Sequence, residues 1–516
     1  MRPLLALLAA LAALCPSTAQ AFCGFYVSGA DGSLYNDATM VVLMREGRRT
    51  VLSMQNNYQG PPEDFALVVP VPVVLSEDNV RTLPVDVFTR VDSLSAPRLV
   101  EYWERDPCYK PPQYDYDEYD LMEAAPTSMA VPRSPPRRDY KVTVEAEFAV
   151  GEYDIVILSA RDSGGLDAWL RDNGYNIPAG AEGVLRPYVA SGTKFFVAKV
   201  DAKRARFSGS GAVLSPLRVH FDSQEFSLPV RLGLLNSDGE QDLLVHVLAR
   251  GQRYEAANYD NAFIPTNIRV QDKVRHDFGT FYDALFRKTT AGEPRTVVTE
   301  YSWDASSCDP CPTPALSAKE ILTLGGDVMG ESNPRGWVLT RLHYRYTAEG
   351  LDEDLVFRAA PPILGGRGTP NNEGSLQEQQ AVVSSYNNQF QGRYVILHWW
   401  DGPMRCENPV RGVWGGKEPG VQAAKGRLQG GKVKSDAPLG QLVDEDIPWI
   451  GVLRGGSAAP EPPSKPAPLT PVEEDIELIE GRCGTGPIGG GLLALLVALV
   501  GWRQRRSGGP TRSQIG

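Results

Sequence analysis

The two ends of this 516-residue chain carry the apolar segments that a membrane signal needs, and the long middle carries no such segment. Residues 1–21 begin with a positive charge at Arg2, continue as an apolar run, and end on the small-x-small pattern Ala19-Gln20-Ala21. This is the pattern of a secretory signal peptide. We therefore predict cleavage after Ala21 and leave residues 1–21 out of the fold.

The second apolar segment lies at residues 483–506. Cys483 precedes a Gly-rich step and a short aliphatic run, and a cluster of basic residues follows at Arg503, Arg505 and Arg506. Residues 487–502 would extend about 24 Å as a helix, against roughly 30 Å of bilayer hydrocarbon. We predict an exported protein held at the cell envelope, in the inner membrane or on the outer surface. The tail is either a short transmembrane anchor or a sorting signal that is later removed at Cys483.

The charge balance argues against a nucleic acid partner. The chain has 52 Lys and Arg against 63 Asp and Glu, a net charge of −11. Binding to phosphates needs a concentrated basic face, and none is present in the sequence. The expected partners are therefore a membrane, through the C-terminal tail, and an envelope or surface ligand.

The length predicts more than one domain, because the exported chain is far longer than a single core requires. After the signal peptide we expect a β-rich N-terminal domain at 22–268 with a mobile insertion at 110–138, a second β-rich domain at 269–455, a Pro-rich stalk at 456–482, the anchor or sorting signal at 483–506 and a polar tail at 507–516.

Hydrophobic periodicity predicts an α+β fold, β-rich, with mostly antiparallel sheets and a few short helices. A hairpin is expected over residues 40–56 and a buried extended run over 65–75, where Pro70 and Pro72 rule out a helix and make the second half an edge strand. A second hairpin is expected where Asn236-Ser237-Asp238-Gly239 joins strands at 226–235 and 243–249. Helices are expected at 80–94, 164–173 (capped by Ser163), 182–190 and 278–288, and further strands at 140–148, 153–159, 194–200, 213–221, 337–346, 355–358 and 393–399.

Six cysteines remain after the signal peptide is removed. In an oxidising compartment disulfides are the default state. With Cys483 assigned to the tail, the body keeps five candidates: Cys23, Cys108, Cys308, Cys311 and Cys406. An odd number allows two bonds at most. We expect Cys23 to pair with Cys108 and the second bond to form among the other three.

Cys308-Asp309-Pro310-Cys311 is the best chemical motif in the chain. A Cys-x-x-Cys pair exchanges disulfides when the first thiol begins a helix. Here serines precede the motif and prolines follow it, which favours a structural disulfide over a redox or metal site.

The other patterns predict no catalytic, cofactor or metal site. Asp162-Ser163-Gly164-Gly165 resembles a protease nucleophile motif, but the first histidine comes only at residue 220, so a helix cap is expected. Four histidines, at 220, 246, 343 and 398, lie in strand patterns and are expected to be core or cross-strand residues rather than zinc ligands. The acidic run 115–120 lacks the central glycine of a calcium loop.

Several stretches together resemble an uncharacterised bacterial family, domain of unknown function 2330. These are AFCGFYVSGADGSLYNDATMVVLMREG (21–47), VLSMQNNYQGPPEDFALVVPVP (51–72), EYWERDPC (101–108), SSCDPCP (306–312), DLVFRAAPPILGG (354–366) and CENPVRGVWGG (406–416). The resemblance implies an exported or envelope protein and no catalytic residue. The tail is similar to a myxobacterial-type C-terminal sorting signal, although Cys483 stands alone where many such tails have Cys-x-Cys.

Two functions remain open on these grounds. The first is an exported, envelope-anchored binding or structural protein. The second is an envelope hydrolase, for example one directed at glycans, whose site is built from dispersed Asp and Glu residues. A pocket holding two facing carboxylates would favour the hydrolase.

Overall fold

The computed structural model describes residues 38–55, 66–109, 141–173, 175, 180–201, 203–208, 211–236, 240–290, 292–415 and 427–429. These residues belong to one compact unit, Met1–Glu461, and the chain from Pro462 to Gly516 is assigned to a second unit. The predicted signal peptide, the insertion at 110–138, the stalk and the tail lie outside the described residues. Within the described residues, no helix is long and apolar enough to cross a membrane.

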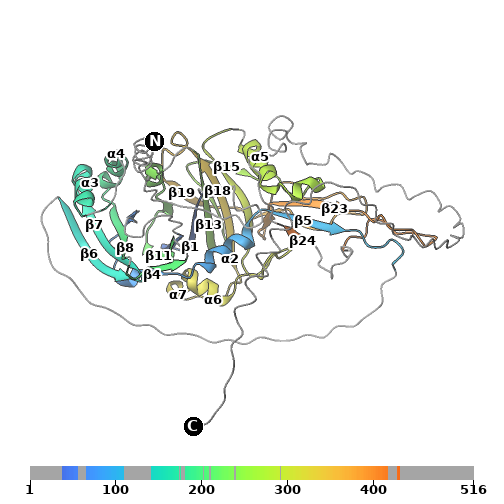
Figure 1. Cartoon of the computed structure of the whole chain (residues 1–516), viewed down its shortest axis with the longest axis horizontal. Coiled ribbons are helices and arrows are strands. Elements are labelled where there is room, and N and C mark those ends of the chain that lie inside the picture. Colours follow the sequence, from blue (N-terminus) through green and yellow to red (C-terminus); the bar gives the residue numbers. More distant parts are fainter. Residues whose placement is uncertain are drawn as a thin grey trace, which may run out of the picture. The chain divides into compact units, whose positions relative to one another are not determined.

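An eleven-stranded sheet forms the centre of the first unit (Figure 1). Its strand order is β21-β20-β22-β17-β18-β13-β1-β2-β11-β4, and β15 lies beside β17. The strands are β1 (Ala38–Glu46), β2 (Arg49–Met54), β4 (Val80–Thr82), β11 (Leu217–Asp222), β13 (Gln241–Arg250), β15 (Asp260–Phe263), β17 (Thr296–Asp304), β18 (Trp337–Tyr346), β20 (Ile363–Gly365), β21 (Val382–Val383) and β22 (Gln389–Gln391).

The middle of this sheet joins segments that are far apart in sequence. β1 and β2 form the predicted antiparallel hairpin, in which Leu43 pairs with Leu52. On its other side β1 runs parallel to β13, and β13 pairs antiparallel with β18. The boundary expected at residues 268 and 269 falls within the short strand β16 (Ile268–Arg269), and strands of the central sheet lie on both sides of it in the sequence. Antiparallel pairs predominate, as the sequence predicted.

A second sheet covers one face of the central sheet. It is wholly antiparallel, in the order β3-β8-β7-β6, with β3 (Ala66–Val71), β6 (Val142–Val150), β7 (Tyr153–Ala160) and β8 (Lys194–Val200). The extended run expected at 65–75 is β3 over residues 66–71, at the edge of the sheet, whereas residues 72–75, expected to continue it, belong to no strand. Alternate residues of β7 face opposite sides: Ile155 and Ile157 pack toward the central sheet, while Val156 and Leu158 pack under two helices. The helices are α3 (Ser163–Asp172) and α4 (Ala181–Ala190), drawn beside β6–β8 in Figure 1.

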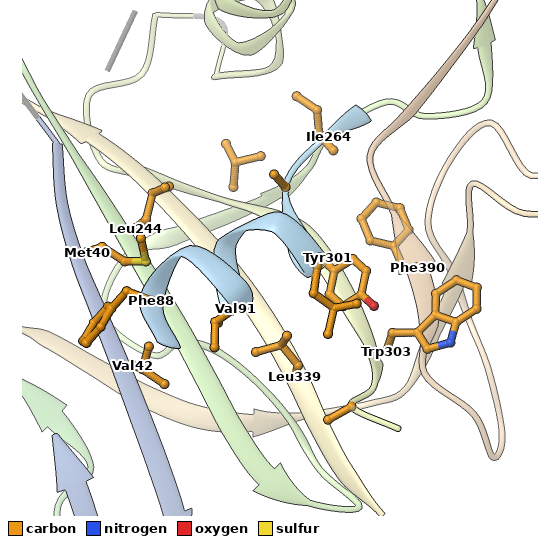
Figure 2. Packing of buried hydrophobic residues seen from close by; sticks show 14 of the residues in the cluster. Met40, Val42, Phe88, Val91, Leu244, Ile264, Tyr301, Trp303, Leu339 and Phe390 are labelled. Atoms are coloured by element: carbon orange, nitrogen blue, oxygen red, sulfur yellow. The ribbon is translucent and has the colours of Figure 1, made fainter. Parts of the chain in front are cut away.

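Helices α2 (Asp86–Ser95) and α5 (Phe278–Thr290) cover the opposite face of the central sheet. Figure 2 shows Phe88 and Val91 of α2 above Met40 and Val42 of β1, with Leu339 of β18 beside them. Both faces of β1 are thus buried, which explains its continuous apolar sequence. The unit consists of four layers: two helices, the small sheet, the central sheet and two further helices.

Three smaller sheets and several short helices complete the described fold. One sheet has the order β16-β23-β5-β24, another β12-β19-β14, and the last pairs β9 with β10. Their strands are β5 (Arg98–Trp103), β9 (Arg206–Ser208), β10 (Gly211–Val213), β12 (Ser227–Leu228), β14 (Arg253–Ala256), β16 (Ile268–Arg269), β19 (Leu355–Ala360), β23 (Arg393–His398) and β24 (Arg427–Gln429). The short helices are α6 (Ala318–Ile321), α7 (Asp327–Met329), 3₁₀ turns at Glu77–Asn79, Arg231–Asn236 and Asp272–Arg275, and a π turn at Leu322–Gly326.

The structure corrects the first predicted helix. Residues 80–82 form strand β4, which pairs with β11, and α2 begins only at Asp86. The reason is Pro84, because a residue before proline is disfavoured in the helical conformation. The apolar residues of 80–94 are therefore divided between a strand, which contains Val80, and a helix, which contains the later ones.

The second predicted hairpin is wrong. Residues 227–228 form β12, which pairs with β19, while Arg231–Asn236 is a 3₁₀ turn. β13 pairs instead with β1 and β18. Pro229 lies directly after β12 and lacks the N–H that a longer ladder would need.

The N-cap of α3 is also corrected. The residue before the helix, Asp162, accepts a hydrogen bond from the Gly165 N–H at 2.9 Å. Ser163, the predicted cap, is the first residue of the helix and donates its hydroxyl to Glu182 of α4 at 2.5 Å. The motif is therefore a helix start, as expected, with its acidic residue as the cap.

Candidate functional site

A disulfide joins Cys108, just after β5, to Cys406, after β23, with 5.5 Å between the two Cα atoms. The predicted Cys23–Cys108 bond is therefore wrong, and Cys23 lies outside the described residues. The cause is the pairing of two distant strands. β5 and β23 run parallel with Trp103 opposite His398, so both strands end at the same edge and their following segments emerge side by side.

The Cys308–Cys311 disulfide is present, with a Cα separation of 4.9 Å, which confirms the prediction of a bond in this motif. The short loop is held from outside by two side chains. Arg98 donates to the Pro310 carbonyl at 3.0 Å, and the Gln391 amide donates to the Asp309 carbonyl. The Asp309 side chain is exposed and lines a pocket.

This pocket has a volume of about 390 Å³. A cavity of this size, with several converging polar groups, is typical of small-molecule binding sites. Two parts of the chain form it, the end of β17 with the disulfide loop, and the segment between β20 and β22. The lining residues are Trp303, Asp309, Arg367, Gly368, Thr369, Asn371, Ser375, Gln377, Glu378 and Gln389.

An ion pair crosses the pocket wall. Arg367 Nε donates to Glu378 Oε2 at 2.8 Å and Nη2 donates to Oε1 at 2.6 Å, while Nη1 donates to the Gln389 amide oxygen. The bonds from Arg367 lower the pKa of the Glu378 carboxyl, and those to Glu378 raise the pKa of the guanidinium. Both groups therefore keep their charges and neutralise one another, so Arg367 offers no unpaired charge to a ligand.

The remaining lining groups are neutral, apart from Asp309. Thr369 and Gln377 are exposed, Ser375 and Gln389 are half-buried, and Trp303 is buried with its indole N–H donated to Ser307 at 3.2 Å. Amide and hydroxyl groups both donate and accept hydrogen bonds. This arrangement suits a ligand that carries both kinds of group and little charge.

Most of this site was missed from the sequence. The sequence of residues 361–369 shows only a composition rich in Gly and Pro, and the cysteine motif is the one part of the pocket that the sequence predicts. A usable signal was present in the polar run Asn371 to Gln380, which is too rich in amide and acidic residues for a strand and too long for a tight turn. Nothing in its spacing shows that it would face residue 309.

A second polar group lies buried between the central sheet and α5. His343 of β18 contacts two carboxylates, with Nδ1 2.6 Å from Glu300 and Nε2 2.9 Å from Asp242. Arg341 donates Nε to Glu300 at 2.6 Å and Nη1 to Asp92. These side chains are almost completely buried and satisfy one another, so the group holds α2, β13, β17 and β18 together and is closed to a ligand.

Electrostatics explain the charge states of this group. Burial raises the pKa of Glu300, but the nearby charges of His343 and Arg341 outweigh it and bring the value to about 2. For His343, burial lowers the pKa and the charges of Glu300 and Asp242 raise it above its usual value. The ring is thus held as an imidazolium that donates from both nitrogens.

The four strand histidines lie where the sequence predicted, in β11, β13, β18 and β23. His246 is buried and its Nε2 lies 3.3 Å from Arg341, whereas His398 is half-buried and contacts Glu101 at 2.7 Å. In the part of the chain that the structure describes, no three His, Cys, Asp or Glu side chains come together as a metal ion would require.

The fold and site define a β-rich α+β protein with a ligand-sized polar pocket beside a disulfide loop. The model of a bacterial protein family, described as uncharacterized proteins conserved in bacteria (DUF2330), matches residues 17–358, and the chain belongs to this family. Trp303 and Asp309 fall within the match, and the pocket segment 367–389 lies beyond it. No curated protein and no solved structure matches the chain.

Proposed function

We propose that this chain is an exported, envelope-anchored binding protein whose pocket between Arg367 and Asp309 holds a neutral ligand rich in hydroxyl groups, such as a sugar. The observation that carries the proposal is the composition of the 390 Å³ pocket, in which amide and hydroxyl side chains surround an internally neutralised Arg367–Glu378 pair. Export and anchoring rest on the two terminal segments of the sequence.

The pocket favours binding over hydrolysis. A two-carboxylate glycosidase needs one carboxyl that stays protonated as the general acid. Of the two acidic side chains in the lining, Glu378 is held ionised by Arg367, and its two oxygens already accept hydrogen bonds. It is poorly suited to donate a proton, which leaves Asp309 without the partner that the reaction requires.

Calorimetric titration of the mature chain tests this proposal. Glucose, galactose and N-acetylglucosamine serve as neutral probes, and inorganic phosphate serves as an anionic probe. We expect a neutral sugar to bind and phosphate not to bind. Gln377→Ala removes an exposed lining amide and should weaken binding about fivefold, the effect of one neutral hydrogen bond.

Gln380→Ala is the matched control, because Gln380 is an exposed amide on the same segment that does not belong to the lining. Its affinity should equal that of the unmodified chain. Binding of phosphate in place of any sugar, or equal affinities for Gln377→Ala and Gln380→Ala, would show that the pocket has another role.

A further inference from the structure

The segment after β23 carries two neighbouring tryptophans, Trp399 and Trp414, that are half-buried. Their ring centroids lie 4.7 Å apart with the planes at 68°, an edge-to-face contact. The Arg411 guanidinium lies 5.7 Å from the centroid of the Trp399 ring. Large aromatic side chains that keep part of their surface exposed are common where a protein binds another molecule.

This segment is fixed in place by covalent and polar contacts. The Cys108–Cys406 disulfide ties it to the end of β5. Glu104, which is buried, accepts hydrogen bonds from the backbone N–H groups of Trp400 at 2.8 Å and Gly412 at 2.6 Å. The two rings are therefore presented in a set position, and their ordering does not have to accompany ligand binding.

The two rings contact the loop that forms one wall of the pocket. Asn371 and Ser375 line the pocket, and the indole N–H of Trp414 donates to the Asn371 carbonyl at 2.8 Å. In the same loop, a Cβ added to Gly374 would lie 2.8 Å from Trp399 Cζ2, so only glycine permits this approach. One loop thus separates the pocket from the tryptophan pair.

We propose that the ligand is a chain of sugar units, with one unit in the pocket and the next units lying over the loop against Trp399 and Trp414. This inference rests on the proposed function and deepens it. A sugar ring has one apolar C–H face and a rim of hydroxyls. The aromatic rings match the apolar face, and the amide and hydroxyl groups of the pocket match the rim.

The length dependence of binding tests the inference. The probes are glucose with cellotetraose and N-acetylglucosamine with chitotetraose, titrated by calorimetry. We expect the matching tetramer to bind about tenfold tighter than its monomer. Trp399→Ala should remove this advantage, so that the tetramer and the monomer bind the variant equally.

Trp400→Ala is the matched control, because Trp400 is a neighbouring half-buried tryptophan whose ring lies beside Gly402. It should keep the tenfold advantage. Intrinsic fluorescence provides a measurement that needs no variant, since the tetramer should change the tryptophan emission more than the monomer, which reaches only Trp303 in the pocket lining.

Each contrary outcome has a distinct meaning. If monomer and tetramer bind equally to the unmodified chain, or if Trp399→Ala keeps the advantage, the extended site is wrong while the pocket stands. If no sugar of either length binds, the proposed function fails and this inference fails with it.

Discussion

At the scale of the residue, protonation of the His343 side chain contributes directly to the stability of the fold. Both of its ring nitrogens face carboxylates, Glu300 and Asp242, inside a region closed to water. A histidine in this position stabilises the fold as a cation. In the unfolded chain the same ring has a pKa near 6.5 and no fixed partner.

Because folding raises the pKa of His343, its contribution to stability is complete below about pH 6.5 and is lost as the pH rises through the higher folded-state pKa. We expect the urea midpoint of the protein to fall over this range. His343→Gln should lower stability by about 3 kcal/mol at pH 6, since it removes the cation shared by Glu300 and Asp242, which then keep only Arg341 and Arg345 as cationic partners. The variant should also show a weaker decline toward high pH.

His276→Gln is the control for this prediction, because His276 is exposed on the turn before α5. Unfolding followed by fluorescence between pH 5 and pH 9 measures all three proteins (pH range chosen around the free histidine pKa of about 6.5). A His343→Gln profile parallel to that of the unmodified chain would contradict the assigned charge state.

At the scale of the element, the start of α3 depends on one carboxylate. Asp162 accepts from the Gly165 N–H, so Asp162→Ala should destabilise the helix start by about 1 kcal/mol. Asp162→Asn keeps an acceptor and should be nearly neutral. Hydrogen exchange in the first turn of α3 should accelerate in the alanine variant alone. Equal exchange in both variants would mean that the cap contributes nothing.

The pairing of β5 with β23 determines a second prediction. Non-reducing peptide mapping should recover a Cys108–Cys406 peptide, and Cys23→Ser should leave it intact. Removing both Cys108 and Cys406 opens a loop with a sequence separation of 298 residues, and should cost up to about 6 kcal/mol in the chain-entropy model. A peptide linking Cys23 to Cys108 would contradict this connectivity.

Local sequence patterns predicted where strands and helices lie better than they predicted which strands pair with each other. β18 was predicted with its observed ends, 337–346, because apolar residues and turn residues mark it in the sequence. The hairpin predicted over 226–249 is wrong because the choice of partner depends on distant strands: β13 pairs with β18, from Gln241 with Tyr346 to Arg250 with Trp337. The candidate site could not be predicted for the same reason. Residues 309 and 378 line one pocket only because β17 pairs with β22.

At the scale of the whole molecule, processing is the testable property. The sequence predicts that the mature chain begins at Phe22 and either keeps its end at Gly516 or loses the segment after Cys483. Intact mass of protein extracted from a bacterial host distinguishes these outcomes. An N-terminus at Met1 would contradict the signal peptide, and an intact C-terminus would leave the tail as a plain anchor.

The parallel contact between β1 and β13 also constrains the order in which the molecule assembles. In a chain synthesised from its N-terminus, β1 and β2 are available early. The pairing of Leu43 with Val247 cannot form until β13 has been synthesised, and β13 cannot pair with β18 until that strand follows. The centre of the sheet therefore cannot close until residue 346 has emerged. Such delayed pairing favours slow folding and leaves apolar strand edges open meanwhile. A fragment ending at residue 268 would keep β13 with one edge permanently unpaired, and it should aggregate where the longer chain folds.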